Sequence, residues 1–132
     1  DERFDVVHVH SYIFYMSNLA ALARAVRNFG YVLNFHGGLN HKVMNDGSYS
    51  RRIWIKENIF DRTIGRLTVK LADKVLTVSR SDIPLIQDCF GVIPEYIPNA
   101  VCTEDFSYCQ NDSRTVTYVG KLEKWKGLEE LI

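Results

Sequence analysis

Short apolar runs alternate with helical patterns along most of this 132-residue chain. The runs are brief and rich in β-branched residues, as buried parallel strands are, and a stretch of helical periodicity follows each of them. Strands are expected at residues 4–9, 31–35, 74–78 and 95–97. Strands separated by helices at this spacing form parallel βαβ units, so the sequence predicts an α/β fold with a doubly wound parallel sheet.

Helical patterns connect the expected strands. The first covers residues 18–28, with Ser17 or Asn18 as the N-cap and Gly30 closing the helix. The second runs over residues 52–72 and is expected to break near Gly65. The third begins at Ser81, its candidate N-cap, and ends at Gly91.

The chain changes character after its fourth expected strand. Residues 102–113 are polar, acidic and without periodicity, which is typical of a linker. A new apolar run at residues 115–119 predicts another strand, and a lysine-rich turn and a helix start follow it. One strand and part of a helix cannot bury a core of their own, so this tail is expected to be the start of a second Rossmann-like domain.

Charge and cysteine usage exclude some classes of protein. Lys plus Arg and Asp plus Glu each total 16, so the net charge is zero and gives no bulk attraction for nucleic acid. The three cysteines contain no C-x-x-C pair, which argues against a disulfide framework and a cysteine zinc site and favours the cytoplasm. The chain has no apolar run that could span a bilayer and no visible signal peptide. It enters its first expected strand within a few residues and has no initial methionine, so it is expected to be an internal fragment.

Two histidines mark the end of the first expected strand. His8 and His10 share one face, because side chains alternate along a strand. Ligands of an open α/β sheet bind beyond the carboxyl ends of its strands, so His10, nearer the tip, is the candidate to meet a substrate. His8 is expected to be packed and hydrogen-bonded. A zinc site is disfavoured, because only His36 and His41 remain to complete it.

The next two strands also end in candidate site residues. His36 follows the second strand and either lines a substrate cleft or serves as a cap or packing residue. Gly37 and Gly38 let the backbone approach a ligand or turn sharply. Ser79 follows the third strand and either contacts a substrate or caps the next helix, and the cap is favoured.

The lysine-rich turn is a candidate anion site. Its strand ends in Gly120, and Lys121 and Lys126 bracket the turn before the helix start. Backbone N–H groups and the positive end of a helix favour an anion at such a place, so the turn is a candidate cradle for a diphosphate. The alternative is a solvated turn without a ligand.

Several segments, in this order, resemble the retaining GT-B glycosyltransferases that are often called group 1. They are DVVHVHS at residues 5–11, FHGG at 35–38, LADKVLTVSRSD at 71–82, YIPNAV at 96–101 and VTYVGKLEKWKGLEELI at 116–132. The resemblance covers nearly the whole chain apart from residues 39–70. It implies that residues 1–103 are the C-terminal part of an acceptor-side Rossmann-like domain, 104–113 the interdomain linker, and 114–132 the start of the donor-binding domain.

The resemblance also implies an activity. The protein is expected to be a hexosyltransferase-like enzyme of EC class 2.4, moving a sugar with retention from a nucleoside-diphosphate sugar to a hydroxyl of a glycan, lipid or small molecule. No cofactor or metal is expected. In similar enzymes a histidine at the position of His10 lies at the reacting sugar, and a basic pair at Lys121 and Lys126 stabilises the leaving diphosphate.

The chain departs from the family pattern at several positions. The family usually has Arg at Lys121, where Lys keeps the charge and loses the guanidinium fork. It usually has Asn-Gly at Asn99-Ala100, so the backbone near the interdomain hinge is expected to differ. The glycine-rich loop and the paired-carboxylate motif of the family are absent from these residues, so the chain alone is expected to be inactive.

Other interpretations remain open. A GT-B sugar-nucleotide epimerase or glucan synthase would keep the fold, and a Rossmann-like binding module would lack catalysis. Basic residues of segment 51–70 fall within an arc of about 140° on an unbroken helical wheel. This helix is therefore a candidate for peripheral contact with the inner face of a membrane, with a solvated surface as the alternative. The open edge of the first strand makes a homo-oligomer a further candidate.

Overall fold

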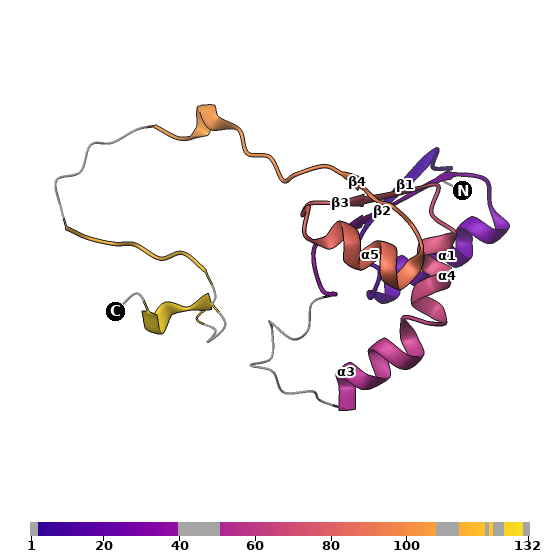
Figure 1. Cartoon of the computed structure of the whole chain (residues 1–132). Coiled ribbons are helices and arrows are strands. Elements are labelled where there is room, and N and C mark those ends of the chain that lie inside the picture. Colours follow the sequence, from indigo (N-terminus) through magenta and orange to yellow (C-terminus); the bar gives the residue numbers. More distant parts are fainter. Residues whose placement is uncertain (1–2, 40–50, 108–113, 121, 123–125, 131–132) are drawn as a thin grey trace. The chain divides into compact units, whose positions relative to one another are not determined.

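The computed structural model describes residues 3–39, 51–107, 114–120, 122 and 126–130. The chain divides into two compact units, Asp1–Pro98 and Asn99–Ile132. The first unit consists of a sheet and the helices that pack on it (Figure 1).

A four-stranded parallel sheet in the order β1-β2-β3-β4 forms the centre of the first unit. Its strands are β1 (Val6–His10), β2 (Gly30–Phe35), β3 (Lys74–Thr77) and β4 (Glu95–Tyr96). Pairing of β1 with β2 runs from Val6↔Gly30 to His10↔Asn34, and pairing of β2 with β3 runs from Val32↔Lys74 to Phe35↔Thr77. The predicted α/β fold with a parallel sheet is therefore confirmed.

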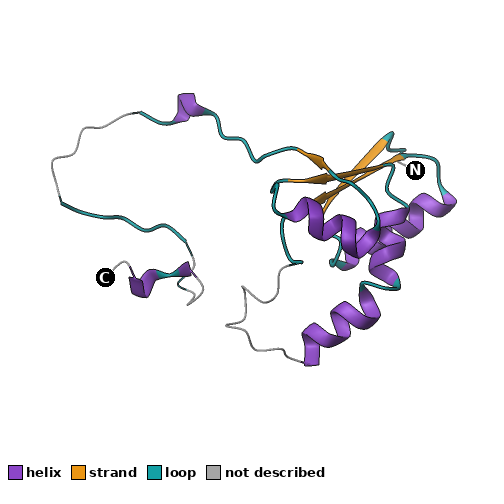
Figure 2. Cartoon of the chain, in the orientation of Figure 1, coloured by secondary structure: helices purple, strands orange, loops and turns teal. Residues whose placement is uncertain are grey.

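The helices of the first unit lie on one face of this sheet, as Figure 2 shows. They include α1 (Tyr15–Val26), α4 (Ile64–Lys70) and α5 (Asp82–Phe90). Each parallel strand is the neighbour of the one before it, and right-handed crossovers between such strands put every helix on the same side. Among the described residues no helix covers the other face, and β1 exposes Val6, His8 and His10 on it.

The hydrophobic core lies between β2 and the helices. Tyr31, Leu33 and Phe35 alternate along β2 and are fully buried. They pack with Ala21 of α1, Val69 of α4, and Ile86 and Phe90 of α5. Tyr12, just beyond β1, is also fully buried and stacks on Phe35 at 5.0 Å between ring centroids. Alternate side chains of the strands therefore hold the helices to one face.

The caps of the first helix differ from those predicted. Helix α1 begins after Phe14, and no side chain forms a capping hydrogen bond there. Ser17 lies inside the helix, where its hydroxyl donates a 2.6 Å hydrogen bond to the carbonyl oxygen of Ser11. The helix ends at Val26, and Gly30 is the first residue of β2. The predicted caps at Ser17 or Asn18 and at Gly30 are therefore wrong.

The long helix predicted over residues 52–72 is three elements. Helix α3 (Arg51–Ile55) continues into a π-helical turn, η1 (Lys56–Phe60), and α4 follows. The interruption is at Thr63, whose φ of −117° and ψ of −95° are not helical. The basic residues of this segment therefore do not lie on one continuous helix. Lys56 forms an ion pair with Asp61 at 2.8 Å, so its charge is already paired.

The break predicted near Gly65 is confirmed, with the interruption at Thr63. Gly65 itself does not interrupt the helix. It is buried inside α4. A Cβ atom there would lie 3.1 Å from the carbonyl oxygen of Phe60 and 3.3 Å from Cε2 of Tyr12. Gly65 therefore allows the close packing of α4 against the Tyr12 ring.

Helix α5 ends as predicted, at Gly91, which has a left-handed φ of 73°. Its start is also as predicted, with Ser81 at the N-cap position, but the Ser81 side chain forms no capping hydrogen bond. No helix in the described residues is long and apolar enough to cross a membrane. Cys89 and Cys102 are free thiols, and Cys109 lies outside the described residues.

The second unit contains two short 3₁₀ turns among its described residues, η2 (Thr103–Asp105) and η4 (Leu128–Glu130). Residues 114–120 form no strand, so the strand predicted at residues 115–119 is not present. A strand needs a hydrogen-bonded neighbour, and the described part of this unit supplies none. The predicted identities of residues 104–113 and 114–132 stay predictions.

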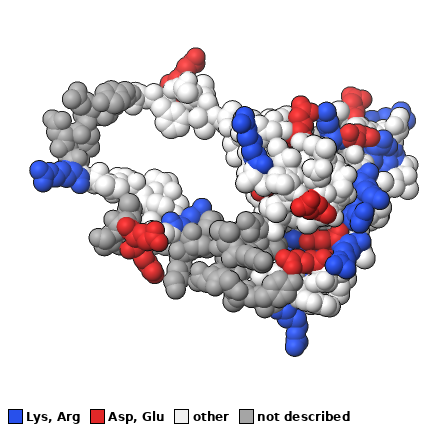
Figure 3. All heavy atoms as spheres, in the orientation of Figure 1, with Lys and Arg blue, Asp and Glu red and all other residues white. Residues whose placement is uncertain are grey.

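Ion pairs join several elements of the first unit. Arg24 of α1 donates to both carboxylate oxygens of Asp73, at 3.1 and 3.0 Å, and Lys74 pairs with Glu95 at 2.7 Å. The Arg24 guanidinium and the backbone N–H of Tyr31 hold the pKa of Asp73 below its usual value. Charges of both signs mix on the face seen in Figure 3.

Candidate functional site

The carboxyl ends of β1 and β2 bring two histidines into contact. His10 is the last residue of β1, and His36 directly follows β2. Nδ1 of His10 lies 2.8 Å from Nε2 of His36, and the ring centroids are 5.0 Å apart. Both residues are exposed. The parallel register therefore joins two candidate site residues that the sequence separates by 26 positions.

His8 lies beside this pair on the open face of the sheet. Its ring centroid is 4.6 Å from that of His10. His8 is exposed and forms no hydrogen bond to another described residue, so the prediction that it is packed and hydrogen-bonded is wrong. The physical reason is that no described helix covers this face. Partial loss of hydration, and then the charges of His10 and His36, lower the pKa of His8 from its ordinary value.

The backbone is strained directly after His10. Ser11 has a left-handed φ of 66°, and in the described residues it is the one non-glycine residue with a positive φ. Its N–H donates to the carbonyl oxygen of Asn34 at 2.7 Å, and its own carbonyl accepts from Ser17. Such a conformation costs roughly 1–3 kcal/mol and is concentrated at functional sites. These hydrogen bonds hold the strained turn next to His10.

Gly37 and Gly38 form the turn after His36. Their φ angles are 82° and 92°, and an added Cβ would meet nothing within 4 Å at either position. The left-handed backbone therefore favours glycine at both positions, and no other described residue approaches the Cβ positions closely. The N–H of Gly37 donates to the carboxylate of Asp82, which fixes the turn to the start of α5.

Ser79 lies just beyond β3 at the same edge of the sheet. Its hydroxyl is 2.7 Å from the hydroxyl of Ser81, and its N–H donates to Oγ1 of Thr77 at 3.3 Å. The described contacts include no bond from the Ser79 hydroxyl to an N–H of α5, so the favoured capping role is wrong. The helix instead uses the backbone carbonyl of Ser79, which accepts from the N–H of Asp82 at 3.2 Å.

Two buried residues at this edge were missed by sequence reasoning. Oδ1 of Asn34 and Oδ2 of Asp82 are buried and accept no hydrogen bond from the described residues. Burial raises the pKa of Asp82, although the Gly37 N–H opposes this. Buried acceptors of this kind are usually satisfied by water or a ligand. The signal for Asn34 was a polar residue inside the apolar run of β2.

Residues 1–105 match the sequence model of Glycosyltransferase Family 4. The chain belongs to this family. This membership indicates a GT-B-like fold and a glycosyltransferase-type function. The matched range contains His10, His36 and Ser79 and ends before Lys121 and Lys126. No curated protein and no solved structure matches the chain.

The candidate donor residues of this family 4 chain lie in the second unit. Lys126 is exposed, and Lys121 lies outside the described residues. A Cβ at Gly120 would lie 2.6 Å from the Tyr118 hydroxyl, so a side chain fits there only if Tyr118 moves. The strand and helix that would frame a diphosphate cradle are not formed in the described part of this unit. The roles of Gly120, Lys121 and Lys126 stay predictions.

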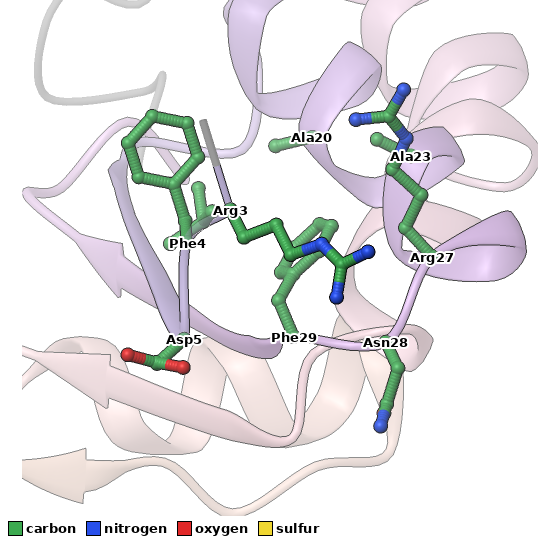
Figure 4. A pocket seen from close by; sticks show the side chains of 9 residues that line it. Arg3, Phe4, Asp5, Ala20, Ala23, Arg27, Asn28 and Phe29 are labelled. Carbon is green, nitrogen blue, oxygen red and sulfur yellow. The ribbon is translucent and has the colours of Figure 1, made fainter. Parts of the chain in front are cut away.

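A hollow of about 700 Å³ lies at the opposite edge of the sheet. Arg3 and Asp5, before β1, and Arg27 and Phe29, before β2, contribute to its lining (Figure 4). This is the amino-terminal edge of the sheet, so the hollow is separate from the histidines. Among the described residues no three His, Cys, Asp or Glu side chains are arranged to hold a metal ion.

Proposed function

We propose that the full-length protein moves a sugar from a nucleoside-diphosphate sugar to an acceptor hydroxyl with retention, as a group 1 enzyme of the GT-B class. The observation that carries this proposal is the 2.8 Å contact between His10 and His36 at the carboxyl edge of a parallel sheet. It occurs in a chain whose family membership makes it a glycosyltransferase. Ligands of open α/β sheets bind at this edge.

His10 acts at the reacting sugar in this proposal. His36, Gly37, Gly38 and Ser79 line the acceptor side, because they follow β2 and β3 at the same edge as His10.

The donor diphosphate binds at Gly120, Lys121 and Lys126. The two lysines stabilise the negative charge that develops on the departing diphosphate, an electrostatic role that needs no metal ion. Their sequence spacing and resemblance to the family motif support this assignment.

The test is nucleoside-diphosphate release by the full-length protein with a panel of sugar nucleotides and acceptors. We expect release that depends on an acceptor, and a glycoside product whose anomeric configuration, read by NMR, matches that of the donor. An isomerised sugar nucleotide without a glycoside would favour an epimerase. Absence of turnover with the whole panel would favour a binding module.

Contact with a membrane is a separate proposal. Five basic residues of segment 51–70 are exposed: Arg51, Arg52, Arg62, Arg66 and Lys70. They remain available to an anionic surface although the helix is interrupted. Sedimentation of the full-length protein with anionic and neutral vesicles tests this. The cytoplasmic location and a homo-oligomeric state stay predictions.

A further inference from the structure

We propose that His36 is a positioning residue that acts through His10. In this proposal Nε2–H of His36 donates to Nδ1 of His10, so that His10 presents its own Nε2–H to an oxygen atom of the substrate. The inference rests on the proposed transferase function, because it takes His10 as the group at the reacting sugar.

The distance between the two rings requires a defined arrangement of protons. At 2.8 Å, one nitrogen must carry the hydrogen and the other must offer its lone pair. Two neutral arrangements satisfy this. Either His36 donates to His10 and both rings carry hydrogen on Nε2, or His10 donates to His36 and both rings carry hydrogen on Nδ1.

The first arrangement is favoured by the chemistry of imidazole. The Nε2–H tautomer is the more stable form of a free neutral histidine side chain, and donation by His36 leaves both rings in that form. Donation by His10 would require both rings to adopt the less stable tautomer. The bond at one ring nitrogen sets the role of the other, so Nε2 of His10 becomes a hydrogen-bond donor.

Rigid elements hold both members of the pair. His10 ends β1 in register with Asn34, and the N–H of Ser11 fixes the next peptide to β2. His36 follows β2, and the next residue, Gly37, is fixed to Asp82. The ring of His8 packs beside His10 at 4.6 Å. His10 lies on a strand and His36 directly follows one, and sites on strands keep their geometry better than sites on loops, so the contact is preorganised.

The remaining nitrogen of His10 is available for a substrate. Among the described residues, none forms a hydrogen bond with Nε2 of His10, and the side chain is exposed. A fixed N–H donor at this edge suits a sugar hydroxyl or a phosphate oxygen of the donor. In this proposal His36 orients the ring of His10, and His10 contacts the substrate.

The tautomer is tested by ¹⁵N NMR of the full-length protein labelled at histidine, with His10 assigned through its loss in His10→Gln. We expect Nδ1 of His10 to be an acceptor and Nε2 to be protonated. His36→Leu should give a mixture of tautomers at His10, whereas His36→Gln should keep one, because its amide N–H can donate. His8→Leu is the matched control, since His8 contacts His10 without a hydrogen bond.

Transfer kinetics give the second readout. His36→Leu should lower kcat about tenfold or more with a smaller change in KM, and His36→Gln should restore most of the loss. An unchanged tautomer in His36→Leu, or equal losses in the Leu and Gln variants with unchanged unfolding temperature, would overturn the proposal. If no sugar nucleotide supports transfer, the proposed function fails, and the NMR measurement still decides whether His36 fixes His10.

Discussion

The hydroxyl of Tyr12 donates a 2.9 Å hydrogen bond to the carboxylate of Asp61, across 49 positions of the sequence. The second oxygen of Asp61 accepts from Nζ of Lys56 at 2.8 Å. Tyr12 is fully buried, and burial followed by the charge of Asp61 raises the pKa of its hydroxyl far above the ordinary value, so it stays protonated as a donor. This network fixes the turn after β1 to the junction of η1 and α4.

Loss of Asp61 should therefore destabilise the fold. Asp61→Ala leaves the Tyr12 hydroxyl and the largely buried Lys56 ammonium without their acceptor. We expect the free energy of unfolding to fall by about 2–4 kcal/mol. Tyr12→Phe keeps the stacked ring and removes one hydrogen bond, so it should cost about 1–2 kcal/mol. Chemical denaturation of the full-length protein measures both. Equal losses for the two variants would show that the Lys56 contact contributes nothing.

Gly65→Ala should also destabilise the protein. The new methyl would meet the Phe60 carbonyl at 3.1 Å and the Tyr12 ring at 3.3 Å, and overpacking of this kind costs about 1–3 kcal/mol. Gly91→Ala is the matched control, because an added Cβ there meets no atom within 4 Å. Only the left-handed backbone disfavours alanine at this position, and it should lower the free energy of unfolding by about 1 kcal/mol. A gain in thermal stability for Gly65→Ala would mean that helix propensity outweighs the contact.

The sequence predicted the parallel sheet well, because short apolar runs and helical periodicity are local signals. Residues 51–70 were predicted less well. Their π-helical turn and the break at Thr63 accompany long-range contacts, namely the hydrogen bond from Tyr12 to Asp61 and the packing of Gly65 on Tyr12. No pattern within the segment itself reports a partner 49 positions away.

The candidate site was predictable in part for the same reason. Strand ends could be located, so His10 and His36 could both be placed at the carboxyl edge. Their direct contact depends on the register His10↔Asn34, which the sequence does not specify. The exposure of His8 depends on which face the helices cover, and that follows only from the sheet order.

The pKa of His8 should lie below 6.5 and depend on His10. A lowered pKa means that the folded state favours neutral His8, so its protonation opposes folding as the pH falls through the ordinary value near 6.5. His10→Asn removes one neighbouring charge and should raise the pKa of His8, which stays below 6.5 because lost hydration remains the larger cause. NMR titration of the full-length protein measures this. A pKa of His8 that falls in His10→Asn would contradict the arrangement.

Lys126→Ala should lower sugar transfer by the full-length protein on the order of a hundredfold, as loss of an electrostatic contact to a developing charge does. The effect should appear in kcat, because the charge of the leaving diphosphate grows in the transition state. Lys121→Arg should be tolerated, since a guanidinium keeps the charge and can bind a phosphate through two N–H groups at once. Lys74→Ala is the matched control, because this exposed lysine pairs with Glu95 on the sheet. Turnover of Lys126→Ala equal to that of Lys74→Ala would remove the diphosphate assignment and leave the lysine-rich turn as a solvated surface.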